Sequence, residues 1–213
     1  MAIAKGRSNI RAEFDLMEQT LKLMVNSVES HFSEMVDSLE TRIFDIEHGE
    51  ESSEEKSDLC KPYFDELADL ETQRFHARNK LVISIYSICE ASLAGICSHY
   101  HVPLKYSPQN KSKKDFYLTD YLFSTGIDYT TENKAYSPYV VYKAIRPLRN
   151  YLTHSQEDNK RASEVVNCIK SIGLENIENQ NGAIQIGSKN ALNEILAICY
   201  NMLLVSEDSA KTK

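Results

Sequence analysis

The sequence predicts an all-α protein: an antiparallel four- to five-helix bundle with a long N-terminal helix and a small β-hairpin insert. The 213 residues include no Trp, only 7 Gly and only 5 Pro, and this composition favours helix over sheet. Apolar residues recur every three or four positions through most of the chain, which is the helical period. One Asn-Gly pair lies between two short alternating segments and indicates the hairpin.

The first predicted element is a long amphipathic helix within residues 1–48, which packs on the rest of the bundle. A stripe of this length requires a partner helix, either in the same chain or in a second protomer. Residues 49–60 are expected to form an acidic loop, because "EHGEESSEEKSD" is a solvated charge run. The apolar stripe consists of Ile10, Phe14, Met17, Leu21, Met24, Val28, Phe32, Met35, Leu39, Ile43 and Ile46.

Residues 61–206 are predicted to form the helical domain, which together with the first helix makes one domain overall. Pro62 suits the first turn of the second helix, which continues to about Tyr100. The segment "LVISIYSICEASLAGIC" is apolar nearly all round, so this half of the helix should be central. Glu90 lies in its middle, and a buried carboxylate needs a partner.

Four further elements follow a break in the pattern over residues 101–135. A short helix is expected near Asp115–Ser124, and a third long helix over Pro138–His154. The segment "NIENQNGAIQIG" predicts a β-hairpin, and Ser188 then caps a final helix. Residues 207–213 are expected to be a disordered tail.

Composition limits the location and the partners of the protein. The N-terminus lacks the apolar region of a secretory signal, and no apolar run approaches the length that spans a bilayer. The five cysteines are scattered without a Cys-x-x-Cys pair, so we expect reduced, mostly buried thiols. We therefore expect a cytoplasmic protein without a membrane partner. The formal charge of −7 disfavours non-specific nucleic-acid binding but permits a local basic site.

The segment "IRPLRNYLTHSQED" (145–158) carries the strongest chemical signal. On an ideal helix, Arg149 and His154 project about 140° apart, whereas Asn150 and His154 lie one turn apart. Pro147 is expected to kink or restart the helix just before the motif. Val141, Ile145, Leu148 and Leu152 share one apolar arc, and Lys143, Asn150 and His154 fall on the opposite arc with Arg146 beside them.

This segment resembles the Arg-(four to six residues)-His motif of the HEPN superfamily. Arg149 and His154 match the motif, and Asn150 matches the polar residue that usually follows the Arg. The resemblance covers about residues 62–206 as a pattern of helices, but only about ten residues specifically. It implies a HEPN-like bundle and a dimeric, metal-independent endoribonuclease of a toxin–antitoxin, abortive-infection or other antiviral system. Gln156 replaces the Tyr of one toxin subgroup, and the subfamily is not assigned.

The residue types suit RNA cleavage without a metal or cofactor. A histidine can take the proton of a ribose 2′-hydroxyl, and an arginine can hold the phosphate and stabilise its developing charge. Because the Arg and His project apart, two chains are expected to build the site together across a dimer axis. We expect support from Glu90 (paired with Arg149 or Arg146), Arg146 and Lys143, and RNA binding by Lys111, Lys113 and Lys114.

Other interpretations remain open at this stage. His154 can instead be a C-terminal cap favoured by the helix dipole, in a non-catalytic HEPN-like interaction or assembly protein. A DNA-binding regulator is disfavoured by the acidic charge. Arg42 and His48 also fit the loose spacing, but acidic residues follow them. Expected partners are RNA, a second copy of the chain, and an antitoxin or defence-system protein.

Overall fold

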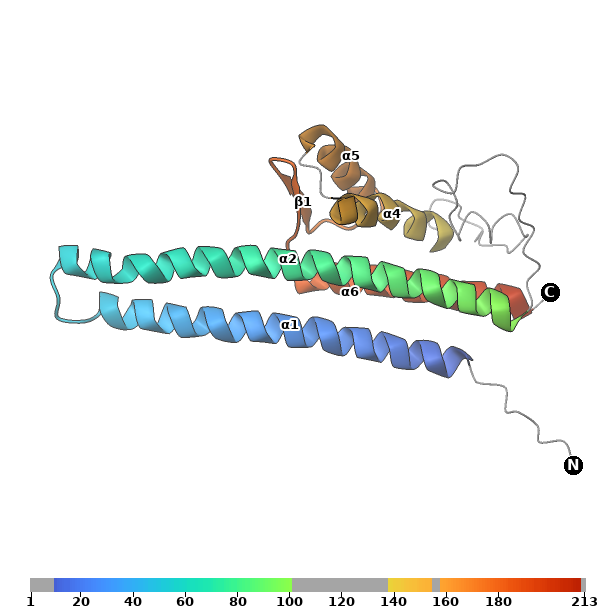
Figure 1. The fold of residues 1–213 in the computed structure, drawn as a ribbon, viewed down its shortest axis with the longest axis horizontal. Coiled ribbons are helices and arrows are strands. Elements are labelled where there is room, and N and C mark those ends of the chain that lie inside the picture. The colour runs from blue at the N-terminus through green and yellow to red at the C-terminus, as the bar shows by residue number, and fades with distance from the viewer. Residues whose placement is uncertain (1–9, 101–137, 155–157, 212–213) are drawn as a thin grey trace, which may run out of the picture.

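The computed structural model describes residues 10–100, 138–154 and 158–211. Within these ranges the protein has five helices and one two-stranded antiparallel sheet, which confirms the all-α class with a β-hairpin (Figure 1). The predicted helix at 115–124, the three lysines at 111, 113 and 114, and residues 1–9 lie outside the described ranges. The elements are α1 (Ile10–Glu47), α2 (Ser53–His99), α4 (Pro138–His154), α5 (Asn159–Lys170), β1 (Ile177–Gln180), β2 (Ala183–Ile186) and α6 (Lys189–Lys211).

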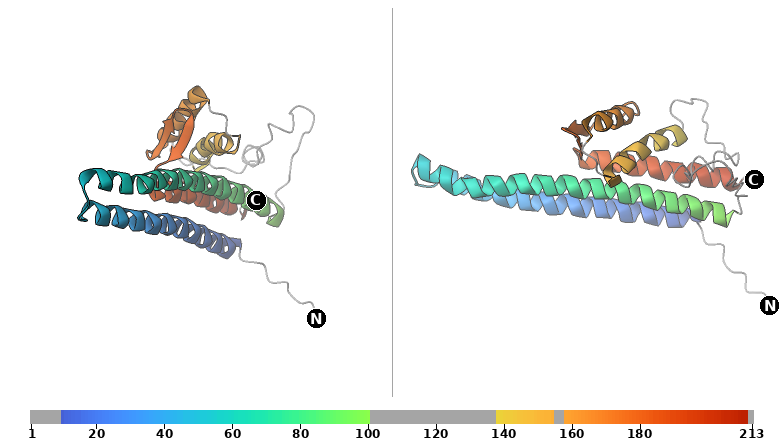
Figure 2. Two further views of the ribbon diagram at one scale, coloured as in Figure 1. Left: turned by 60° about the vertical axis from the view of Figure 1, so that its left-hand side comes forward. Right: turned by 45° about the horizontal axis from the view of Figure 1, so that its top comes forward.

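The helices α1 and α2 form a long antiparallel hairpin, and α6 packs along one half of it (Figures 1 and 2). Arg11 at the start of α1 pairs with Asp208 near the end of α6, so these helices are antiparallel. Tyr100 at the end of α2 donates a hydrogen bond to Glu207, so α2 and α6 run parallel. The expected antiparallel order therefore holds for α1 but not between α2 and α6. The helices α4 and α5 and the β-hairpin lie on the opposite side of α2 from α1.

The long stripe of α1 finds its partners in the same chain. Phe14, Leu21 and Val25 are buried against the rest of the bundle, whereas Met24 of the predicted stripe is exposed. The stripe shifts from Met24 to Val25 because α1 packs on both α2 and α6, not on one helix alone.

The predicted acidic loop is mostly helix, and this expectation was wrong. The chain turns over residues 48–52, and α2 begins at Ser53. Ser52 forms a capping box: its hydroxyl accepts from the Glu55 amide, and the Glu55 carboxylate accepts from the Ser52 amide. Acidic side chains in a first helical turn also interact favourably with the helix dipole. Pro62 therefore lies inside α2 rather than in its first turn.

The second half of α2 is central, as predicted. Val82, Ile85, Leu93 and Ile96 are almost fully buried. By length and composition alone, α2 could cross a membrane, which corrects the expectation that no run is long enough. One such helix is weak evidence of a membrane span, since the central helix of a bundle has the same composition. In α2, 44% of its most apolar 18-residue segment is buried in the protein. All five cysteines are free; Cys168 is half-buried, and the other four are buried.

The C-terminal elements follow the sequence pattern with two exceptions. Asn181 and Gly182 take φ values of 53° and 93° at the hairpin turn, as a two-residue turn of this type requires. The Ser188 hydroxyl accepts from the Ala191 amide and caps α6, as expected. The helix α5 was not predicted, although Ala162, Val165, Val166 and Ile169 have helical spacing and are buried. The predicted tail is wrong as far as residue 211, because α6 continues to Lys211 with Glu207 and Ala210 buried.

Candidate functional site

The helix α4 carries the Arg149–His154 motif and has the predicted bounds. It packs on α2, α5 and α6, and it does not restart at Pro147, which lies exposed within it. Ile145 and Leu148 of the predicted apolar arc are fully buried. Tyr142 and Tyr151 are also buried, so the buried face of α4 is wider than the predicted arc.

Arg149 faces α2 from this helix. Its Cζ atom lies 6.0 Å from the centroid of the Tyr86 ring, which is within the range of a cation–π contact. Its Nη1 donates a 3.0 Å hydrogen bond to the Oδ1 atom of Asn150. Its Nε is buried and has no hydrogen-bond partner in the described part of the chain. Arg149 is thus held on two sides and keeps an unused donor.

Glu90 lies on the α2 surface that Arg149 faces. Burial raises the pKa of its carboxyl group, and the positive charges of Arg149 and then Arg146 partly counteract this rise. The expected neighbourhood of Glu90, Arg149 and Arg146 is therefore present. Burial therefore outweighs the favourable effect of the two positive charges on the ionised form of Glu90.

His154 is the last residue of α4 and is exposed to solvent. Asn150 is half-buried one turn earlier and accepts the hydrogen bond from the Arg149 guanidinium. Lys143 is exposed and Arg146 half-buried, and each has an interaction of its own in the structure. The structure thus brings Arg149, Asn150, Arg146 and Glu90 together. Arg149 faces α2 and His154 faces solvent, in agreement with the wide angle expected between them.

The aromatic support of Arg149 was missed by sequence reasoning. The rings of Tyr86 and Tyr142 stack with centroids 4.9 Å apart and planes within 6°. Burial is the largest influence on both phenols and raises the pKa of each above its ordinary value. The sequence carries two weak signs of this pair. Tyr86 lies in the apolar segment of α2, four residues before Glu90, and Tyr142 lies on the buried face of α4. The pair gives Arg149 a rigid platform.

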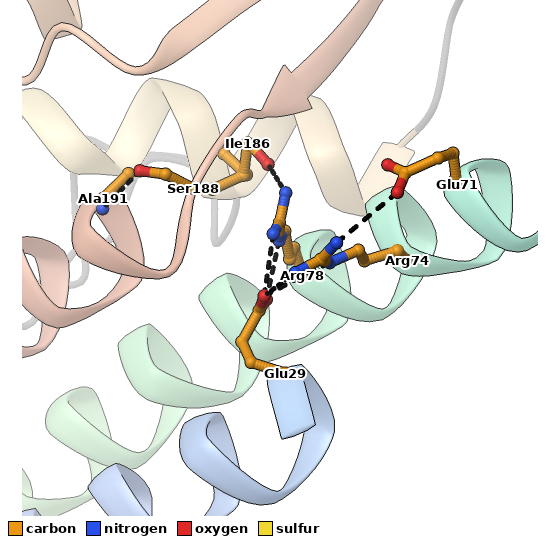
Figure 3. Close-up of polar contacts among 7 residues, drawn as sticks. All are labelled: Glu29, Glu71, Arg74, Arg78, Ile186, Ser188 and Ala191. Carbon is orange, nitrogen blue, oxygen red and sulfur yellow. Dashed lines mark hydrogen bonds and ion pairs between the residues drawn. The ribbon is translucent and has the colours of Figure 1, made fainter. Parts of the chain in front are cut away.

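A second polar cluster, also missed, joins α1, α2 and β2 around Glu29 (Figure 3). The Glu29 carboxylate accepts four hydrogen bonds, two from Arg74 (3.2 and 2.8 Å) and two from Arg78 (2.7 and 2.8 Å). Arg78 also donates to the Ile186 carbonyl at 3.1 Å. Glu29 is 5% exposed and Arg78 4%. Glu29 lies outside the apolar stripe that the sequence predicted, and it follows Val25 by four residues on the face that is buried in the structure.

A cavity of about 720 Å³ opens beside the Glu29 cluster, not beside Arg149. Its charged lining is balanced, with Glu29, Glu71 and Glu178 against Arg74, Arg78 and Lys189. The Arg78 donors are used within the fold, and Arg74 is shared between Glu29 and Glu71, at 3.4 Å from the latter. We therefore assign this cluster a structural role, in which it fixes α1 and the hairpin to the middle of α2.

Among residues 10–100, 138–154 and 158–211, no group of three or more His, Cys, Asp and Glu could hold a metal ion. No protein-family model matches the chain, and no curated protein or solved structure is significantly similar to it.

Proposed function

We propose that the protein is a cytoplasmic, metal-independent endoribonuclease of the HEPN type, with a HEPN-like bundle, acting as a toxin or antiviral effector. The observation that carries this proposal is the setting of Arg149. It lies beside Tyr86, Asn150 and Glu90, on the helix that ends in exposed His154, with an unused Nε donor. An arginine that serves only the fold usually has its buried donors satisfied.

The proposed reaction uses these groups in separate roles. His154 takes the proton of the ribose 2′-hydroxyl, and the oxygen attacks the adjacent phosphorus. Arg149 holds the phosphate and stabilises the charge that develops on it. Asn150 orients the guanidinium through the 3.0 Å hydrogen bond. The 5′-oxygen leaves and takes the proton from His154, so the products are a 2′,3′-cyclic phosphate and a 5′-hydroxyl, and DNA is not a substrate.

We propose that the active form is a homodimer in which Arg149 of one chain acts beside His154 of the other. In one chain the two side chains project about 140° apart on an ideal helix, and Arg149 faces α2 while His154 faces solvent. A two-fold axis near the end of α4 would bring an arginine from each chain to the histidine of the other. An antitoxin or defence-system protein is the expected regulator.

A non-catalytic assembly protein is the second candidate. The observation that favours it is the exposure of Phe44, Leu59 and Phe64 near the turn of the α1–α2 hairpin, as on a surface that binds a partner. In this alternative His154 only interacts with the dipole at the end of α4.

The deciding experiment compares RNA cleavage by the wild type, His154→Ala and His48→Ala. His48 is a matched control, because it also ends an Arg-to-His spacing with Arg42 and lies just after the end of α1. We expect EDTA-resistant cleavage and a cyclic-phosphate end from the wild type and from His48→Ala, and neither from His154→Ala. Equal behaviour of the three proteins would favour the assembly protein.

A further inference from the structure

The half of the α1–α2 hairpin beyond the Glu29 cluster, residues 31–71, stands apart from the bundle and is called the arm here. The main core takes its α1 side chains from Ile10 to Val25 and its α2 side chains from Leu81 to Cys97. The other helices lie along that half, and the arm projects beyond them (Figures 1 and 2). The arm buries only Leu39, Ile43, Cys60 and Leu70 among its apolar side chains.

The turn of the arm is nevertheless well built. The capping box of Ser52 and Glu55 starts α2. The Lys56 ammonium donates hydrogen bonds to the Glu47 carbonyl at 3.0 Å and to the Gly49 carbonyl at 2.8 Å. The Glu47 carbonyl, in the last turn of α1, thereby gains a partner that its own helix does not supply. These contacts present a defined surface at the far end of the molecule.

Large apolar side chains are exposed on this surface. Phe44 is 57% exposed and Phe64 51%; Leu59 is 48% exposed but projects about 140° from Phe64 on α2. Phe64 borders a groove of about 520 Å³, whose charged lining consists of Glu47, Asp65, Lys56 and Lys61. An aromatic side chain at the edge of a groove is the kind of group that anchors a protein partner.

The arm is also far more acidic than the rest of the protein. Residues 31–71 contain fourteen Asp and Glu against three Lys and Arg, a net charge of −11. The remaining residues contain seventeen Asp and Glu against twenty-one Lys and Arg, a net charge of +4. The two parts add up to the overall charge of −7. Negative charge of this density repels RNA, anionic lipid and the arm of a second copy.

From this combination of exposed apolar side chains and negative charge we infer that the arm is a docking surface for a basic protein helix. The helix would place apolar side chains on Phe44 and Phe64 and its Lys and Arg side chains against the surrounding carboxylates. The inference does not depend on the proposed nuclease activity, because the arm lies outside the bundle half that contains α4.

The test uses the full chain and a defined probe. The probe is a synthetic 18-residue helical peptide with Leu at i, i+3, i+4 and i+7 spacing and Lys at the other positions. Binding is measured by fluorescence anisotropy, beside a scrambled peptide of the same composition. We expect the ordered peptide to bind about tenfold more tightly than the scrambled one, and both to weaken as salt rises.

Two pairs of variants locate the binding site. Phe44→Ser with Phe64→Ser should weaken binding about tenfold, whereas Leu16→Ser with Leu23→Ser should not change it. Leu16 and Leu23 are matched controls, since they are 65% and 68% exposed on α1 outside the arm. Circular dichroism of each variant checks that the helices are retained.

The charge requirement is tested in the same way. Asp45→Lys with Asp65→Lys reduces the negative charge of the arm from −11 to −7 and should weaken peptide binding several-fold. Glu164→Lys with Glu194→Lys makes the same change on α5 and α6 and should have little effect. The inference would be overturned if the control pair outside the arm weakened peptide binding as much as the arm pair, for either the charge variants or the apolar variants. The inference would also be overturned if mutation of the arm abolished self-association of the protein and left peptide binding unchanged. The arm would then bind a second copy of the chain.

Discussion

Replacement of Glu29 by Ala should destabilise the protein by about 3–5 kcal/mol, the usual cost of removing one partner of a buried ion pair. The carboxylate accepts two hydrogen bonds from each of Arg74 and Arg78, at 2.7–3.2 Å. Without it, the charge of Arg78 stays buried, and of its hydrogen bonds only the one to the Ile186 carbonyl remains. The loss exceeds that of an ordinary hydrogen bond because an uncompensated charge, not a neutral group, remains inside the fold.

The assay is urea unfolding of the full chain at neutral pH, followed by far-ultraviolet circular dichroism. Glu18→Ala is the matched control: Glu18 pairs with Lys22 at 2.8 Å on the same helix, with Glu18 19% and Lys22 50% exposed, and its loss should cost about 1 kcal/mol or less. A double replacement of Glu29 and Arg78 by Met should be more stable than Glu29→Met alone. A loss below about 1 kcal/mol for Glu29→Ala would show that Glu29 is not needed to compensate the buried charge of Arg78.

The pH dependence of a second variant, Glu29→Gln, follows from the pKa of Glu29. Burial acts to raise this pKa, but hydrogen bonds and positive charge from Arg78 and Arg74 outweigh it, so the pKa lies below its ordinary value of 4.5. A carboxyl group with a lowered folded-state pKa contributes stability above the unfolded value and loses it as the pH falls through the folded value. The stability difference between wild type and Glu29→Gln should therefore be constant above about pH 5 and shrink below pH 4.5.

Three further substitutions test other parts of the account. Glu90→Gln should leave the free energy of unfolding at neutral pH unchanged or higher, because burial raises the pKa of the carboxyl group. The same variant should lose cleavage about tenfold if Glu90 positions Arg149, and unchanged cleavage would refute that role. Tyr151→Phe should cost about 1–2 kcal/mol in a urea melt, since the hydroxyl contacts the Gly182 and Asp158 carbonyls. Ser52→Ala should cost about 1 kcal/mol through loss of the capping box, and full stability of this variant would show that the box does not hold the turn.

Helix spacing predicted most of the fold because the period of apolar residues is a local property. The α4 bounds and the hairpin turn at Asn181 and Gly182 were correct for that reason. The start of α2 was wrong because the run "SSEE" was interpreted as solvated charge, although the same residues form a helix cap. The helix α5 shows helical spacing but is short and follows the motif directly, so it was overlooked.

The surroundings of the motif depend on contacts between helices that are far apart in the chain, and the sequence pattern of one helix does not predict such contacts. The helical wheel separated Arg149 from His154 by about 140°, but it could not predict that Arg149 faces the Tyr86 ring on α2. The Glu29 cluster joins residues 45 and more positions apart in the chain, so no local pattern predicts it.

The central claim is that Arg149 and His154 act together across two chains, and mixing two inactive variants tests it most directly. Arg149→Ala and His154→Ala are each purified, then mixed in equal amounts and allowed to exchange subunits before addition of RNA. Half of the dimers become mixed, and each mixed dimer holds one intact site of two, so the mixture should recover about one quarter of wild-type cleavage. Recovery of this size would support the composite site. A mixture as inactive as its two components, under conditions where subunit exchange is demonstrated, would contradict it.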